Sequence, residues 1–207
     1  MSVLTNKDLI AALTPAEGAD RLVVTPILDP KQIGPASIDL RLGPDIIALQ
    51  KSRVAGLDLT SMESRREIGR YARTIHVGYH GKFVLHPNTL VLGATLEYLR
   101  VPDHLFCSVE GRSSLGRAGL IIATATSVQP GFRGCITLEI ENLGPVPITL
   151  FPGLRIAQLV VFSGNPGRPY QGQFRCPTGP ELGEIRSEPD VIFFSSAPPQ
   201  PRIPGNR

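Results

Sequence analysis

The sequence predicts a mainly β subunit with a few short helices. The chain of 207 residues contains 21 glycines and 20 prolines, which are common in the turns between short strands. Several runs alternate apolar and polar residues with a period of two, as half-buried strands do. The length suits one domain with a substantial core. We therefore expect a β domain over residues 1–180 and a proline-rich, partly flexible tail over residues 181–207.

The first element is a short helix, which we predict over residues 6–13. Thr5 precedes it and Asp8 follows three residues later, which is the pattern of a capping box. Apolar residues then recur at helical spacing, and Pro15 ends the segment. This helix is expected to contribute packing rather than chemistry.

Residues 37–42 alternate strictly and predict a strand whose leucines and Ile38 point inward. Asp39 and Arg41 then lie two residues apart on the other face. As an exposed ion pair they would contribute little to stability. Buried at an interface between subunits, they would be structural and costly to separate.

Further strands are predicted where apolar runs are bounded by turn residues. They are the segments 89–96, 105–110, 148–150 and 154–162. Residues 51–75 are instead predicted to be a solvated loop, because their positive charges lie among glycine and serine without a regular period.

The run RSSLGR at residues 112–117 is the first candidate binding segment. Arginine makes forked, charge-assisted hydrogen bonds to phosphate oxygens, and serine hydroxyls or backbone N–H groups can occupy the remaining positions. Ser113 or Ser114 could also cap a short helix whose N-terminus attracts anions. The alternative is a capped surface turn with solvated arginines, and the hexapeptide alone favours neither interpretation.

The alternating run at residues 135–141 carries the second candidate. Its aliphatic residues point one way, while Thr137, Glu139 and Glu141 point the other. In the simplest arrangement both glutamates are solvated. If their face lines a cleft, Glu139 becomes a candidate general acid and base. The turn at residues 130–131 brings the two candidate segments back toward each other, within one subunit or across an interface.

These segments belong to a larger ordered set of motifs. The set comprises QIGPASIDLRLG at residues 32–43, FVLHP at 83–87, GRSSLGR at 111–117, PGF with Gly134 at 130–134, TLE at 137–139, PG with QL at 152–159, and YQGQ at 170–173. One such motif is weak evidence, but the whole set in this order is specific. From about Leu4 to Thr178, the chain resembles the dCTP deaminases of the dUTPase superfamily.

The resemblance implies a dUTPase-like distorted β-barrel of jelly-roll type, assembled as a homotrimer with its sites at the subunit interfaces. It implies zinc-independent hydrolytic deamination of dCTP, or of a close cytosine nucleotide, to dUTP and ammonia in pyrimidine deoxynucleotide metabolism. Such an enzyme is a hydrolase acting on the C–N bond of a cyclic amidine. Mg²⁺ would be bound with the nucleotide triphosphate, and no metal would be held by the protein alone. Because residues 32–43 belong to the shared pattern, we favour the buried interface role for Asp39 and Arg41.

The resemblance also assigns roles to individual residues. Glu139 matches the proton shuttle, and Ser113 and Arg117 match residues near the reacting water, so these three are the predicted catalytic residues. Backbone carbonyls of residues 123–124 would help to hold the water, and Ala125 would pack against the base. The predicted nucleotide-binding residues are Arg112, Ser113, Ser114, Leu115, Gly116, Arg117, Ala123, Thr124, Ala125, Gln129, Thr137, Leu138, Glu139, Tyr170 and Gln173.

The chain departs from the family pattern at three places. Gln129 stands where the family usually has an aspartate that contacts the sugar 3′-hydroxyl and, in dUTPases, activates the hydrolytic water. Glutamine can hydrogen-bond a hydroxyl but cannot act as a base, which argues against dUTP hydrolysis. The segment 119–125 is one residue shorter than usual and lacks a common histidine. The tail has only Tyr170 where two tyrosines and a lysine are expected, although Arg168 or Arg175 could replace the lysine.

The departures leave two alternatives open. The first is a dUTP diphosphohydrolase, or a bifunctional deaminase and diphosphatase. The second is a non-catalytic nucleotide-binding trimer on the same scaffold, which would bind nucleotide without chemistry.

Charge and cysteine content exclude other classes. The chain has 21 Lys and Arg against 18 Asp and Glu, a net charge of +3, which is too small to indicate general nucleic-acid binding. Cys107, Cys135 and Cys176 are widely spaced, so the signature of zinc deaminases is missing. Cys107 and Cys135 lie in strand-like runs and are expected to be buried. Reduced thiols and the lack of a membrane-spanning or signal segment predict a cytoplasmic protein with no membrane partner. The small net charge predicts no nucleic-acid partner, and the resemblance implies a small-molecule nucleotide as the partner.

Overall fold

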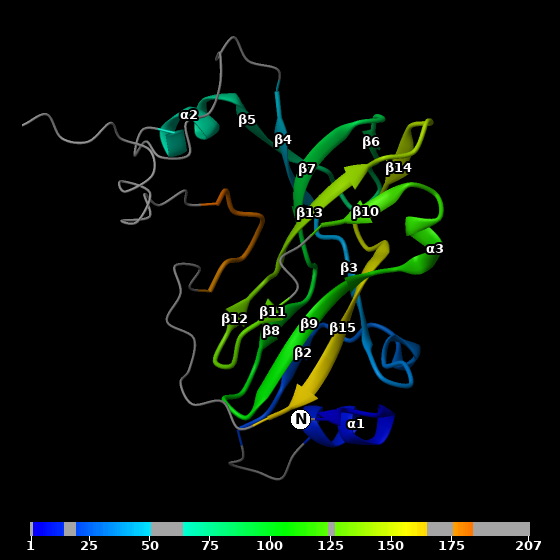
Figure 1. Cartoon of the computed structure of the whole chain (residues 1–207), viewed down its shortest axis with the longest axis vertical. Helices are drawn as coiled ribbons and strands as arrows, with labels where there is room; N and C mark the ends of the chain where they lie inside the picture. Colours follow the sequence, from blue (N-terminus) through cyan, green and yellow to red (C-terminus); the bar gives the residue numbers. More distant parts are fainter. Residues whose placement is uncertain (1, 15–19, 51–63, 124–126, 165–175, 184–207) are drawn as a thin grey trace, which may run out of the picture. The chain divides into compact units, whose positions relative to one another are not determined.

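The protein is described by a computed structural model (Figure 1). The described residues are 2–14, 20–50, 64–123, 127–164 and 176–183. Contacts within the chain divide it into two units, of which the larger comprises residues 1–49 and 73–181, and the smaller residues 50–72 and 182–207. The larger unit contains all the described candidate site residues. The domain boundary near residue 180 stays a prediction.

Antiparallel sheets dominate the larger unit, as the mainly β prediction requires. One sheet has the order β1 (Ser2–Val3), β15 (Arg155–Ser163), β9 (Leu105–Gly111) and β11 (Ser127–Val128), with β3 (Ile38–Arg41) also paired to β15. A second has the order β10 (Leu120–Ile122), β13 (Thr137–Asn142), β7 (Thr89–Ala94), β4 (Asp45–Leu49) and β5 (Ala72–His76). Smaller sheets join β12 (Arg133–Gly134), β8 (Tyr98–Arg100) and β2 (Val23–Thr25), and β14 (Ile148–Leu150) with β6 (Phe83–Leu85).

The predicted N-terminal helix is confirmed as α1, Asn6–Leu13. The Asp8 carboxylate accepts hydrogen bonds from the Thr5 N–H at 2.9 Å and from the Thr5 hydroxyl at 2.6 Å. These bonds favour the charged carboxylate and lower the pKa of Asp8. Leu9 on the inner face is completely buried, so the helix contributes to the core.

The alternating runs form the core as predicted. In and beside β13, Ile136, Leu138 and Ile140 are buried, and Leu138 and Ile140 have no exposed surface. The strands predicted at residues 105–110 and 154–162 are present as β9 and β15, which pair along almost their whole length. Burial of each large aliphatic side chain contributes about 1.5–3 kcal/mol, so the paired strands hold the site segments on a rigid support.

The structure bears out one sequence-based prediction and overturns another in this part of the chain. Asp39 and Arg41 are buried, with 8% and 6% exposed, as favoured for β3, although they do not pair with each other, and the subunit interface stays a prediction. Their partners lie far away in the sequence, where strand alternation cannot reveal them. The loop predicted at 51–75 contains helix α2 (Ser64–Tyr71) in the smaller unit, followed by β5, while residues 51–63 lie outside the described residues. Arginine and glutamate favour helix formation strongly enough to outweigh a single glycine in α2.

Cys107 in β9 predicts a pH dependence of stability. Burial raises the pKa of its thiol from 9.0 to about 12. Between these values the unfolded chain releases a proton that the folded chain keeps, so the free energy of unfolding falls as the pH rises. We expect this thiol to contribute a loss of up to about 1.4 kcal/mol per pH unit above about pH 9. Urea unfolding between about pH 8 and pH 10 measures the slope.

The Cys107→Ala variant should lack this contribution, although its baseline stability is lower because a buried group is removed. Cys176→Ala is the matched control, because the Cys176 thiol is exposed and forms no disulfide. Identical slopes in the wild-type chain and Cys107→Ala would contradict the assignment.

Candidate functional site

The predicted phosphate-binding run begins where β9 leaves the first sheet. Gly111, the last residue of β9, pairs with Ala157 of β15, and Arg112 is the N-cap residue of the short helix α3, Ser113–Gly116. Ser113, Ser114 and Arg117 are exposed. The run therefore presents two hydroxyls and a guanidinium to solvent from the end of a well-paired strand.

A close backbone approach fixes the end of this turn. Gly119 has φ +94°, and a Cβ atom there would lie 2.5 Å from the Cα of Gly144. The Leu143 N–H also donates to the Gly119 carbonyl at 2.8 Å. Only glycine tolerates both this φ and this contact, so the turn is fastened to the loop after β13. As a result, β10 is placed directly against β13, beside α3 (Figure 1).

Glu139 lies in the middle of β13, opposite Leu92 of β7. The Ala123 N–H donates to the Glu139 backbone carbonyl at 2.8 Å, so the predicted water-holding segment begins beside the predicted proton shuttle. The Oε2 atom of Glu139 is buried, and no described residue donates a hydrogen bond to it. A buried carboxylate oxygen without a hydrogen-bond donor is energetically costly. We therefore expect a water molecule or a ligand to donate a hydrogen bond to this atom.

The other predicted binding residues have different positions. Gln129 is exposed, and its Nε2 atom donates to the Ser127 hydroxyl at 3.2 Å. Leu138 is completely buried in the core, so its side chain is not available to a nucleotide. Thr124, Ala125, Tyr170 and Gln173 lie outside the described residues.

Residues 176–183 run along the segment that leads to Glu139. The Cys135 N–H donates to the Pro177 carbonyl at 2.7 Å, and the Glu181 N–H donates to the Thr137 hydroxyl at 3.2 Å. Gly134 has φ +134°, and a Cβ atom there would lie 2.4 Å from the Cδ of Pro177. The half-buried Thr137 is therefore in contact with the tail, two residues from Glu139.

The two predicted catalytic segments are not joined within one chain. Among the residues that the structure describes, no hydrogen bond or ion pair connects the Glu139 carboxylate with Ser113 or Arg117. Within one chain, the described residues of the Arg-Ser-Ser turn are therefore not in polar contact with the Glu139 carboxylate.

Arg112 instead lies near a set of charged residues that the sequence analysis did not connect with it. Its Nη1 atom is 3.7 Å from Oδ2 of Asp39. The same oxygen accepts a hydrogen bond from Nη1 of Arg155 at 3.1 Å, and Oδ1 accepts one from Gln158 at 3.2 Å. Arg155 also donates to Asp29 at 2.9 Å. Asp39 and Arg112 belong to motifs selected from the sequence, and Arg155 lies within the PG–QL motif, but no sequence signal connected the three.

A second buried charge cluster supports β3. The completely buried Glu97 accepts hydrogen bonds from the Arg41 backbone N–H at 2.8 Å, from Arg41 Nη1 at 3.1 Å and from Gln32 Nε2 at 2.9 Å. Gln32 also donates to the Asp39 carbonyl at 2.8 Å and accepts a hydrogen bond from Arg41. The cluster fixes the backbone of Asp39, and through it the carboxylate that faces Arg112.

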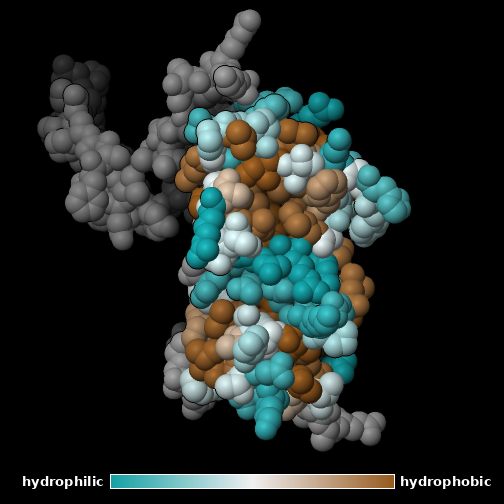
Figure 2. Space-filling model, turned by 90° about the vertical axis from the view of Figure 1, so that its right-hand side faces the viewer, coloured by the Kyte–Doolittle hydropathy of each residue, from teal (hydrophilic) through white to brown (hydrophobic). Residues whose placement is uncertain are grey.

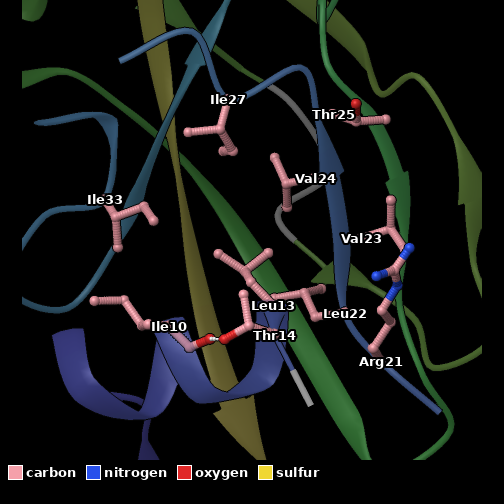
Figure 3. Close-up of a pocket in the computed structure, with 10 residues that line it drawn as sticks. All are labelled: Ile10, Leu13, Thr14, Arg21, Leu22, Val23, Val24, Thr25, Ile27 and Ile33. Carbon is pink, nitrogen blue, oxygen red and sulfur yellow. Dashed lines mark hydrogen bonds between the residues drawn. The ribbon is translucent and has the colours of Figure 1, made fainter. Parts of the chain in front are cut away.

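A cavity of about 360 Å³ lies between α1, β2 and the segment that leads to Ile33 (Figure 3). Its walls are mainly aliphatic, and the Thr14 hydroxyl is occupied by the Ile10 carbonyl at 2.7 Å. No predicted catalytic or nucleotide-binding residue lines it. The cavity is therefore not the candidate active site.

The surface shows neither a metal cluster nor a membrane-spanning element within the described ranges. No group of three or more His, Cys, Asp or Glu side chains is placed there to hold a metal ion. No helix of that part of the chain is long and apolar enough to cross a membrane. Figure 2 shows a hydrophilic band across one face, with an apolar area toward the end where β6 and β14 lie. The exposed apolar residues at and near these two strands include Val84, Leu143, Val146 and Phe151.

Comparison with known proteins identifies the family. The family model described as dCTP deaminase-like matches residues 4–164. The chain belongs to this family. It is 40% identical over 179 residues to the dCTP deaminase of Natronomonas pharaonis, covering 81% of this chain and 88% of that protein. It is 43% identical over 170 residues to a dCTP deaminase, dUMP-forming, from Coprothermobacter proteolyticus, covering 77% of this chain and 86% of that protein.

The fold of this dCTP deaminase-like chain is shared with a solved structure. The crystal structure of 2′-deoxycytidine 5′-triphosphate deaminase from Agrobacterium tumefaciens matches with a TM-score of 0.59 and 24% identity. The match covers 78% of this chain but only 46% of that chain, so the likeness extends over less than half of the Agrobacterium protein. The expected mainly β fold is thereby confirmed, and it is the fold of a solved dCTP deaminase.

Proposed function

We propose that the chain catalyses the hydrolytic deamination of dCTP to dUTP and ammonia. The observation that carries the proposal is the buried Oε2 atom of Glu139, which lacks a donor among the described residues, next to the backbone of Ala123. A carboxylate in this state is ready to accept a proton from a water molecule. Membership of the dCTP deaminase-like family identifies the cytosine ring as the group that this water attacks.

The reaction needs one group that moves protons. Water adds to C4 of cytosine while Glu139 accepts its proton and delivers a proton to N3 of the ring. Glu139 then takes the proton of the new C4 hydroxyl and passes it to the amino group, so that the C4=O bond forms, the C4–N bond breaks, ammonia leaves and the carboxylate is restored. Ser113 and Arg117 would orient the water and stabilise the charged glutamate, with carbonyls of residues 123–124 as further acceptors.

We propose that the triphosphate binds the exposed run at residues 112–117, where Arg112 provides a forked donor and the two serines provide hydroxyls. Thr137, Leu138, Gln129 and Ala125 would surround the base and sugar, Leu138 through its backbone. Tyr170 and Gln173 would cover the phosphates. Mg²⁺ would be carried by the triphosphate oxygens, and no step above depends on the ion.

A homotrimer supplies the missing contact between the two catalytic segments. Within the described chain, Glu139 and the turn at 112–117 are not joined, so we propose that each site combines the glutamate of one subunit with the turn of another. The exposed apolar side chains of Val84, Val146 and Phe151 suit burial between subunits. We further propose that the enzyme is cytoplasmic and that residues 1–180 form the catalytic domain.

A second candidate product is dUMP. The relative from Coprothermobacter proteolyticus is named dUMP-forming, so a bifunctional enzyme would release pyrophosphate as well as ammonia. In this chain Gln129 occupies the position where the resemblance places a carboxylate. An amide cannot take a proton from the water that attacks a phosphate, which favours dUTP as the final product.

One assay separates these outcomes. Ammonia release and the absorbance change from cytosine to uracil are followed with Mg²⁺ for dCTP, CTP, dCMP and deoxycytidine, and the products are separated by anion exchange. We expect turnover of dCTP with dUTP as product and no pyrophosphate. Pyrophosphate formed together with dUMP would establish the bifunctional reaction. Nucleotide binding without turnover of any substrate would instead indicate a non-catalytic trimer.

A further inference from the structure

The charged residues around Asp39 include three arginines with unequal partners. Arg41 is held by Glu97 and Gln32 in the interior. Arg155 is held by two carboxylates, at 2.9 Å and 3.1 Å. Among the residues that the structure describes, Arg112 has one looser contact, 3.7 Å from Asp39, which is beyond hydrogen-bond distance. Of the three guanidinium groups, that of Arg112 is therefore the one most available to a phosphate.

The looseness of this contact has a cause in the structure. Asp39 is nearly buried, and its carboxylate already accepts hydrogen bonds from Arg155 on one oxygen and from Gln158 on the other. Such a carboxylate interacts strongly with any cation nearby. With Arg155 in place, much of its charge is balanced before Arg112 approaches. Without Arg155, Arg112 is the remaining cation beside it.

We infer that Arg155 is a positioning residue for triphosphate binding, because it balances Asp39 and so keeps the Arg112 guanidinium oriented but free. The inference rests on the proposed function, in which Arg112 contacts the triphosphate. Arg155 acts through Asp39 and need not touch the substrate. Its role is to prevent Asp39 from competing with phosphate for Arg112.

The test is a variant and its suppressor. In Arg155→Gln, Asp39 pairs directly with Arg112, and the KM for dCTP should rise by roughly tenfold with a much smaller change in kcat. In the double variant Asp39→Asn/Arg155→Gln, the competing carboxylate is gone, and the KM should return to within about threefold of the wild-type value. Arg155→Lys keeps the positive charge and should stay close to wild type. A purely structural role of Arg155 would not be reversed by a second substitution in the same cluster.

Asp29→Asn is the matched control. It removes an ion pair of Arg155 of similar length but leaves Arg155 on Asp39, so the KM should stay within about twofold of the wild-type value. An unchanged KM in Arg155→Gln overturns the inference. A double variant whose KM remains raised also overturns the inference. If Arg155→Gln does not fold, the double variant alone is the test, because Asp39→Asn/Arg155→Gln replaces the ion pair by two neutral amides.

Binding of inorganic triphosphate, measured by calorimetry, separates this inference from the proposed function. Its dissociation constant should follow the same order as the KM values: weakened in Arg155→Gln and restored in the double variant. If the wild-type protein deaminates no cytosine nucleotide, the proposed function fails while this binding series still tests the role of Arg155. If turnover is normal and the series shows no weakening, the inference alone fails.

Discussion

Glu139→Gln is expected to lower kcat for dCTP by about 10²–10⁴-fold, because glutamine cannot carry the proton from water to the ring and the leaving amine. The KM should change little, since the substitution preserves the shape of the side chain. Folding should also survive, because the replacement removes a buried charge whose Oε2 atom has no donor among the described residues. Steady-state kinetics, thermal unfolding and calorimetric binding of dCTP measure these three properties.

Glu141→Gln is the matched control for this prediction. Glu141 lies two residues further along β13, on the same face, so the strand and the chemical change are identical. Its kcat should remain within about threefold of the wild-type value. Retained turnover in Glu139→Gln would contradict the proposed proton path, and an equal loss in both variants would indicate damage to β13 rather than to the reaction.

Glu97→Gln is expected to destabilise the fold by about 3–5 kcal/mol, because it leaves the Arg41 guanidinium buried without a negative partner. For a chain of this size, that loss corresponds to a fall in the midpoint of thermal unfolding of roughly 10 °C. The effect should extend to binding, because Arg41 and Gln32 fix the backbone of Asp39. Differential scanning calorimetry measures the midpoint directly.

Asp20→Asn provides the comparison. It breaks the ion pair between Asp20 and Arg100, which has a distance of 2.7 Å but is more than 40% exposed on both side chains. Screened surface pairs of this kind contribute about 0–1 kcal/mol. A midpoint for Glu97→Gln no lower than that for Asp20→Asn would show that the buried cluster is not a main source of stability.

Local patterns in the sequence were sufficient for elements whose partners are close or whose periodicity is clear. The helix at residues 6–13 depends on Thr5 and Asp8, three residues apart, and the strands β9 and β14 depend on apolar residues between turns. β3 shows where such patterns fail. Its alternation alone predicts one solvent-exposed face. Glu97 and Arg155, which come from distant parts of the chain, pair with Arg41 and Asp39 and offset the free-energy cost of burying them.

The candidate site shows the same division. Single residues such as Glu139 and Arg112 could be selected from their chemical type and their motifs. The contact between Ala123 and Glu139 depends on the pairing of β10 with β13, and the contact between Arg112 and Asp39 depends on the pairing of β15 with both β3 and β9. These long-range pairings decide which polar groups meet, and no spacing within one segment encodes them.

The anchoring of Pro177 and Glu181 along Gly134–Thr137 has a consequence for the strand that carries Glu139. The Cys135 N–H and the Thr137 hydroxyl each meet a backbone partner from about 40 residues further along the chain. The entropy lost in bringing these distant residues together is lost once, when the chain folds. Residues 177 and 181 are therefore already held beside β13 before a nucleotide binds, and ordering them adds no cost to binding.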